Sequence, residues 1–86
     1  MTDYFTTTPT PVAPGGTVKV CFDFTAAGVT TPVAVTIDYS PSSVADDNFT
    51  LTPQRPCADR TVPSGATTAI AIDDSGVSQD HPIAIS

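Results

Sequence analysis

Apolar and polar residues alternate with a period of two along much of this chain. The clearest example is TVKVCFDF, residues 17–24, in which valine and phenylalanine occupy every second position. Successive side chains of a strand point to opposite faces, so this pattern predicts a strand with one buried face. No stretch shows helical periodicity longer than one turn, and proline interrupts most windows.

Strand-like runs recur roughly every 8–12 residues with Gly, Pro, Ser or Asp between them, which is typical of an all-β sandwich or barrel. We expect one domain over residues 1–86 and a loop at 25–31. In the fourth run Phe49 and Leu51 are expected to face the core, and in the sixth Ile70 and Ile72. The expected strands are residues 4–10, 17–24, 32–39, 48–52, 57–62, 67–73 and 81–86.

The charge of the chain is one-sided, with nine acidic residues against three basic ones and a net charge of −6. Every acid is aspartate, which disfavours helix interiors and suits turns. A strongly negative protein repels phosphate backbones, so we expect no nucleic acid partner. No apolar run approaches the roughly 20 residues of a membrane helix, so we expect no membrane insertion.

The segment VAPGGTVKV, residues 12–20, resembles a turn of immunoglobulin-like (Ig-like) modules in bacterial surface and secreted proteins, where it joins the first two strands. The resemblance implies a seven-stranded antiparallel Ig-like or fibronectin III-like β-sandwich. In that arrangement the first, second, fifth and fourth strands share one sheet, with the second and fifth as neighbours. The antibody subclass is not expected, because the chain has no tryptophan.

Within this arrangement Cys21 falls on the second strand and Cys57 on the fifth. Alternation directs Cys21 away from the core, and Cys57 also points outward if Val62 faces inward. Two outward cysteines on adjacent antiparallel strands can meet at a non-hydrogen-bonded pair and form a disulfide. We therefore expect a Cys21–Cys57 bridge and a secreted or cell-surface protein, because disulfides persist in oxidising compartments. Two free thiols are the alternative.

Two aspartate pairs, Asp46 with Asp47 and Asp73 with Asp74, are candidate calcium ligands, because hard cations prefer clustered oxygens. The expected topology places their loops at opposite ends of the sandwich, so they should not share one ion. Paired aspartates in turns more commonly cap the turn. We expect no cofactor.

The sequence offers little for catalysis. His81 is the only histidine and follows Asp80, and neighbours on a strand face opposite ways and cannot readily form a dyad. No nucleophile elbow and no glycine-rich phosphate loop are present. We expect an exposed His81 and no enzymatic activity.

The first strand, rich in Thr and Pro, suits a sheet edge that pairs with another protein or another copy. Tyr4 and Phe5 are the aromatic residues expected to be presented there, whereas the others fall on core faces. The sequence thus predicts a non-catalytic extracellular structural or protein-interaction module, such as a surface-protein domain or a virion or filament subunit. The alternative is a carbohydrate- or calcium-binding module.

Overall fold

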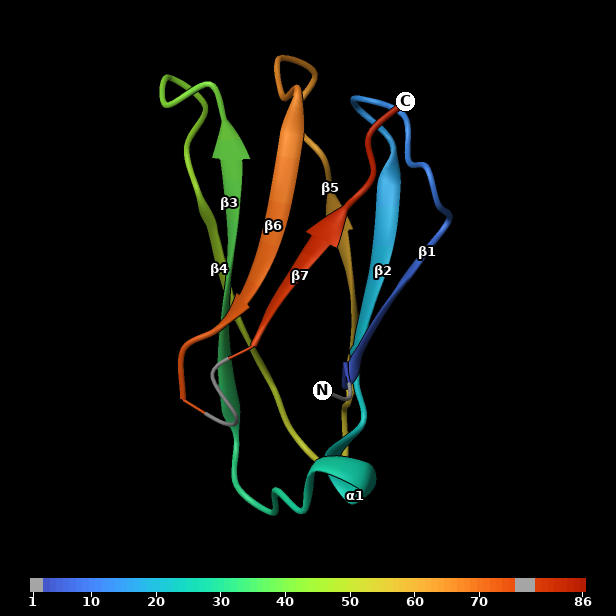
Figure 1. Ribbon diagram of the computed structural model, residues 1–86, viewed down its shortest axis with the longest axis vertical. Coiled ribbons are helices and arrows are strands. Elements are labelled where there is room, and N and C mark those ends of the chain that lie inside the picture. The colour runs from blue at the N-terminus through green and yellow to red at the C-terminus, as the bar shows by residue number, and fades with distance from the viewer. Residues whose placement is uncertain (1–2, 76–78) are drawn as a thin grey trace.

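The structure is a computed structural model that describes residues 3–75 and 79–86, and it consists of two antiparallel sheets (Figure 1). One sheet has the order β1-β2-β5 and the other β4-β3-β6-β7. The expected all-β architecture with seven antiparallel strands is confirmed for the described residues. The elements are β1 (Phe5–Thr8), β2 (Thr17–Phe22), α1 (Phe24–Ala27), β3 (Val33–Ser40), β4 (Asp47–Leu51), β5 (Cys57–Thr61), β6 (Thr68–Asp73) and β7 (Asp80–Ile83).

Every second side chain of β2 is buried, as its period-two pattern predicts. Val18, Val20 and Phe22 are at most 1% exposed, and the residues between them lie on the outer face. Two glycines make the preceding turn possible. Gly15 has a positive φ of 82°, and a Cβ on Gly16 would lie 2.9 Å from the Ala13 carbonyl oxygen. Any larger residue at either position is therefore strained.

The strand expected to reach Phe24 ends two residues earlier, at Phe22. Asp23 turns the chain, because its carboxylate accepts a hydrogen bond of 3.1 Å from the Ala26 amide and caps the single helical turn α1. Gly28, in the left-handed conformation, ends that turn. Phe24 still reaches the core, from α1 rather than from a strand.

The position of β4 corrects the expected sheet order. This strand was expected in the sheet of the cysteine strands, but it pairs with β3, with Phe49 opposite Val35. The connection over residues 41–46 is short, and a short connection favours pairing of consecutive antiparallel strands. As a result, β2 is the only strand that pairs with β5 in the described part of the chain.

The face of β6 that meets the core is the opposite of the expected one. Ala69 and Ala71 point inward and are 3% and 0% exposed, whereas Ile70 points outward and is 38% exposed. The cross-strand neighbours of the two alanines on β3 are large and buried, Tyr39 beside Ala69 and Ile37 beside Ala71. Small residues fit there because the interior is close-packed.

An aromatic cluster forms the part of the core beneath β1 and β2. Phe22 is at its centre, with ring centroids 5.2 Å from Phe5, 5.0 Å from Phe24 and 6.3 Å from Tyr4, all in edge-to-face geometry. Phe49, expected to face the core, is only half-buried on the edge strand β4.

Candidate functional site

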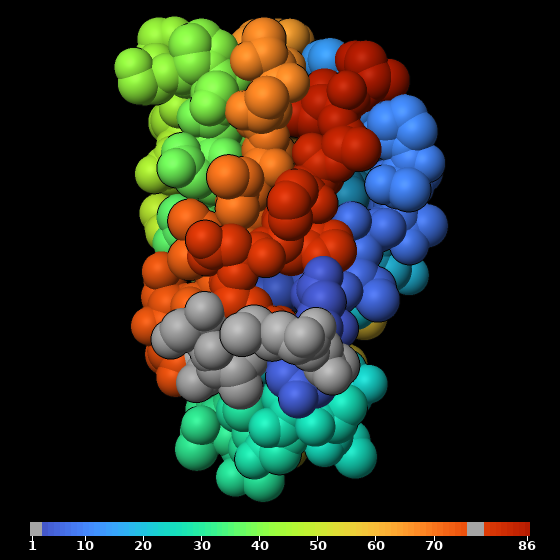
Figure 2. Space-filling view, viewed as in Figure 1, coloured from blue at the N-terminus to red at the C-terminus, as the bar shows by residue number. Residues whose placement is uncertain are grey.

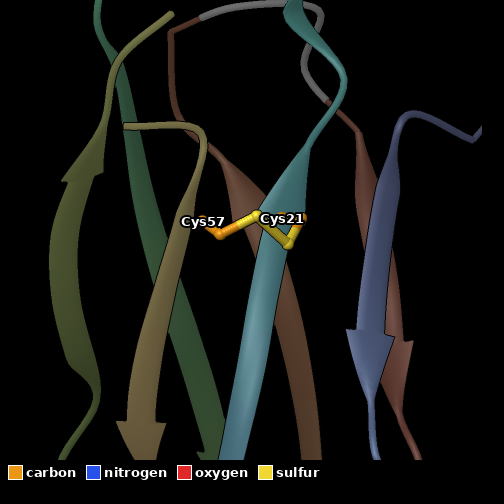
Figure 3. Close-up of a disulfide and its surroundings, with 2 residues drawn as sticks. All are labelled: Cys21 and Cys57. Carbon is orange, nitrogen blue, oxygen red and sulfur yellow. A yellow bond between two sulfur atoms is a disulfide. The ribbon is translucent and has the colours of Figure 1, made fainter. Parts of the chain in front are cut away.

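The two cysteines form a disulfide on the outer face of the three-stranded sheet, as expected (Figure 3). Cys21 on β2 and Cys57 on β5 are cross-strand partners with Cα atoms 4.0 Å apart. The Phe22 amide donates to the Pro56 carbonyl next to them, at 2.9 Å. Phe22 and Pro56 therefore form a hydrogen-bonded cross-strand pair. The adjacent pair, Cys21 and Cys57, is a non-hydrogen-bonded pair.

One side of the sandwich is closed by an ion pair between the two sheets. The Arg60 guanidinium on β5 donates two hydrogen bonds to the Asp47 carboxylate on β4, at 2.7 and 2.5 Å. It also lies 4.7 Å from the centroid of the Phe49 ring. The hydrogen bonds to Asp47 raise the pKa of Arg60 above its ordinary value. Arg60 thus points inward from the edge strand β5, and the Asp47 carboxylate of the opposite sheet neutralises its charge.

Tyr39 gives a testable prediction about this side of the core. Its hydroxyl is buried without a hydrogen-bond partner among the described residues, and desolvation, followed by the nearby Asp47 charge, raises its pKa above 10.0. An unsatisfied buried hydroxyl is destabilising, so Tyr39→Phe should raise the free energy of unfolding by about 1 kcal/mol at neutral pH.

The same substitution has a pH signature. Above about pH 10 Tyr39 ionises in the unfolded chain but stays protonated in the folded chain, because its folded-state pKa is higher. The wild type therefore loses stability as the pH rises from about 10 through the folded-state pKa. The difference between wild type and Tyr39→Phe in urea unfolding at pH 7 to 11 isolates this contribution. A variant that is less stable than wild type at pH 7 would show that the hydroxyl is bonded.

On the other side of the sandwich, His81 of β7 packs against the N-terminal segment. The expectation of an exposed histidine was wrong. Its side chain is 18% exposed, and its Nδ1 pairs with the Asp3 carboxylate rather than with Asp80. Its Nε2 lies 3.2 Å from the Thr7 hydroxyl on β1. The Tyr4 amide also donates to the Gln79 side chain, at 2.9 Å. These contacts tie the edge strand β7 to the N-terminal segment.

The contacts of His81 join a carboxylate, an imidazole and a hydroxyl in the order found in hydrolytic triads. Sequence reasoning missed this arrangement, because Asp3 and His81 are 78 positions apart in the chain and strand alternation carries no information on partners in the other sheet. The Thr7–His81 contact links β1 in one sheet to β7 in the other, and Asp3 lies in the segment that leads into β1. The arrangement is therefore a contact that holds β7 against β1 and the segment before it.

The four aspartates considered as calcium ligands lie in two places. Asp46 and Asp47 lie where β4 begins, and Asp73 and Asp74 lie at the opposite end, where β6 ends (Figure 1). Asp47 is paired with Arg60, Asp73 accepts from the Ser75 amide at 2.9 Å, and Asp74 accepts from a threonine hydroxyl at 2.5 Å. Among residues 3–75 and 79–86, no group of three or more His, Cys, Asp or Glu residues could hold a metal.

Tyr4 and Phe5, the expected interaction residues, are placed differently from each other. Phe5 belongs to the core and is 2% exposed, so β1 in its present position does not present this ring. Tyr4 is half-buried and packs against the core. Pairing of a partner with the first strand stays a prediction. A shallow groove between β6, β7 and β1 lies on the face shown in Figure 2, and its lining includes Ile70 and Pro82.

No family model, curated protein or solved structure matches this chain. Its class therefore follows from the fold: an all-β chain of two antiparallel sheets with one disulfide on the outer face of the smaller sheet. In the described residues, no helix has the length and apolar character needed to cross a membrane.

Proposed function

We propose that this chain is a non-catalytic Ig-like module of the extracellular space that serves as a structural or protein-interaction unit. The two antiparallel sheets and the paired-glycine turn before β2 support an Ig-like assignment. The Cys21–Cys57 bridge supports an oxidising compartment, since such bonds are rare where thiols are kept reduced.

The observation that carries the proposal is how the charged side chains are used. Both ion pairs of the described residues help to hold the sandwich together: Asp47 with Arg60 joins β4 to β5, and Asp3 with His81 joins the segment before β1 to β7. They lie at the two sides of the sandwich, where β4 faces β5 and where β1 faces β7. Because these charged side chains stabilise the packing of the two sheets, they favour a structural role for the chain over a catalytic one.

Three assays separate this function from its rivals. We expect no calorimetric signal from calcium and no hit on a glycan panel. We also expect wild type and His81→Gln to hydrolyse p-nitrophenyl acetate at equal rates. A sub-millimolar affinity for calcium or a glycan would support the ligand-binding alternative. Ester hydrolysis that depends on His81, and also on Thr7, would show that the contacts of His81 form a catalytic site.

A further inference from the structure

The outer edge of β5 carries a row of unused backbone hydrogen-bonding groups. The bonds of Phe22 with Pro56 and of Val62 with Gly16 fix the alternation, so the even-numbered residues of β5 face β2. The N–H and C=O groups of Cys57, Asp59 and Thr61 then point away from β2. All three residues are exposed. In the described chain, their outward N–H and C=O groups form no backbone hydrogen bond with any other segment.

The edges on the opposite side of the sandwich present fewer outward backbone groups than β5 does. On β1, the Phe5 amide donates to the Asp3 carboxylate, and prolines at 9 and 11 end the strand. On β7, Pro82 occupies an outward position and has no N–H to offer, while the next carbonyl, that of Ala84, accepts from Val12. Such features disfavour the pairing of an edge strand with another chain. β5 has no proline.

The second edge on the β5 side belongs to β4 and is shorter. The bonds from Asp74 to the Ala34 carbonyl and from Thr67 to the Ser40 carbonyl direct the even-numbered residues of β3 toward β6. Consequently the odd-numbered residues of β4 pair with β3, and only Asn48 and Thr50 direct backbone groups outward. β5 has three such residues, so it offers the longer ladder to an added strand.

The side chains of β5 specify the chemistry of an added strand. Asp59 is exposed on the outer face and has no ion-pair partner among the described residues. A residue directly opposite it should be basic, because opposite charges stabilise cross-strand pairs. The residues opposite Ala58 and Arg60 point inward, toward the half-buried Phe49, and should be apolar.

A second copy of this chain does not meet these requirements. Antiparallel pairing of two β5 edges centred on Asp59 places the two Asp59 carboxylates opposite each other, which is destabilising. Each chain also carries a net charge of −6 and opposes association with itself.

We propose that the outer edge of β5 is a docking site for an extended segment of another protein, with an apolar–basic–apolar core that pairs with residues 58–60. The segment adds a fourth strand to the β1-β2-β5 sheet. β2 shows the pattern that fits, since Lys19 lies opposite Asp59 and is flanked by the inward Val18 and Val20. This inference rests on the proposed function and specifies its partner.

The probe is a fluorescein-labelled peptide with the core Thr-Val-Lys-Val-Thr, followed by fluorescence anisotropy. We expect saturable sub-millimolar binding to wild type and at least about tenfold weaker binding to Asp59→Pro, which removes the outward N–H and the carboxylate. Thr50→Pro, the matched change on the β4 edge, should bind as wild type does. Circular dichroism and thermal unfolding establish that both variants fold.

Two further reagents keep the test decisive if Asp59→Pro does not fold. N-methylation of the peptide's lysine amide should abolish binding, because this amide faces β5, whereas N-methylation of a flanking valine should not. Asp59→Asn should weaken binding and reduce its salt dependence. Three results would overturn the docking site. They are equal binding to wild type and Asp59→Pro, unchanged affinity when the lysine amide of the peptide is methylated, and no binding up to about 1 mM. The proposed function fails separately, through the calcium, glycan or ester assays.

Discussion

Replacing Phe22 with alanine is expected to destabilise the protein by about 3–5 kcal/mol, the largest effect of any single core substitution considered. Phe22 is 1% exposed and contacts the rings of Tyr4, Phe5 and Phe24. Removing the ring leaves a cavity and ends three edge-to-face contacts at once. A small domain has only about 5–15 kcal/mol of total stability, so this loss should lower the urea midpoint markedly.

Urea unfolding followed by far-ultraviolet circular dichroism measures this loss, and Phe49→Ala is the matched control. Phe49 undergoes the same chemical change but is half-buried at a sheet edge, so its loss should be markedly smaller. If Phe22→Ala cost no more than Phe49→Ala, the aromatic cluster would not be the centre of the core.

Loss of the disulfide is expected to cost about 4 kcal/mol, the value that the chain-entropy model gives for a sequence separation of 36 residues. Both sulfur atoms lie outside the core, so Cys21→Ser with Cys57→Ser should keep the native circular dichroism spectrum while its denaturation midpoint falls. The effect acts through the unfolded state, whose freedom the bridge restricts.

Guanidinium unfolding with and without a phosphine reductant provides the measurement. The reductant should lower the wild-type midpoint to that of the double serine variant and leave the variant unchanged. An unchanged wild-type midpoint, or two reactive thiols per chain in the unfolded protein without reductant, would contradict a stabilising bridge.

The pattern along the chain predicts strands well and their partners poorly. In β2, large apolar residues alternate with polar ones or cysteine, so only one face can be buried and Cys21 is correctly placed outside. In β6 every residue from Ala69 to Ile72 is apolar, so alternation cannot choose the face. The choice is made by volume, because Tyr39 and Ile37 on β3 leave room only for alanine beside them.

The candidate sites differ from the sequence-based predictions for a related reason. Alternation assigns a face to Asp47 and to Arg60 but does not say that β4 belongs to the sheet opposite β5. Once β4 pairs with β3, the two side chains meet across the sandwich and the outer edge of β5 is left open. Neither the ion pair nor the open edge has a signal in the local sequence.

Amide hydrogen exchange of β5, read by NMR, tests the open edge most directly, because exchange reports which N–H groups are hydrogen-bonded. The structure predicts an alternating pattern in which the amides of Ala58 and Arg60 are protected and those of Cys57, Asp59 and Thr61 exchange rapidly. Uniform protection along β5 would mean that another strand covers this edge, and it would contradict both the sheet order and the proposed docking site.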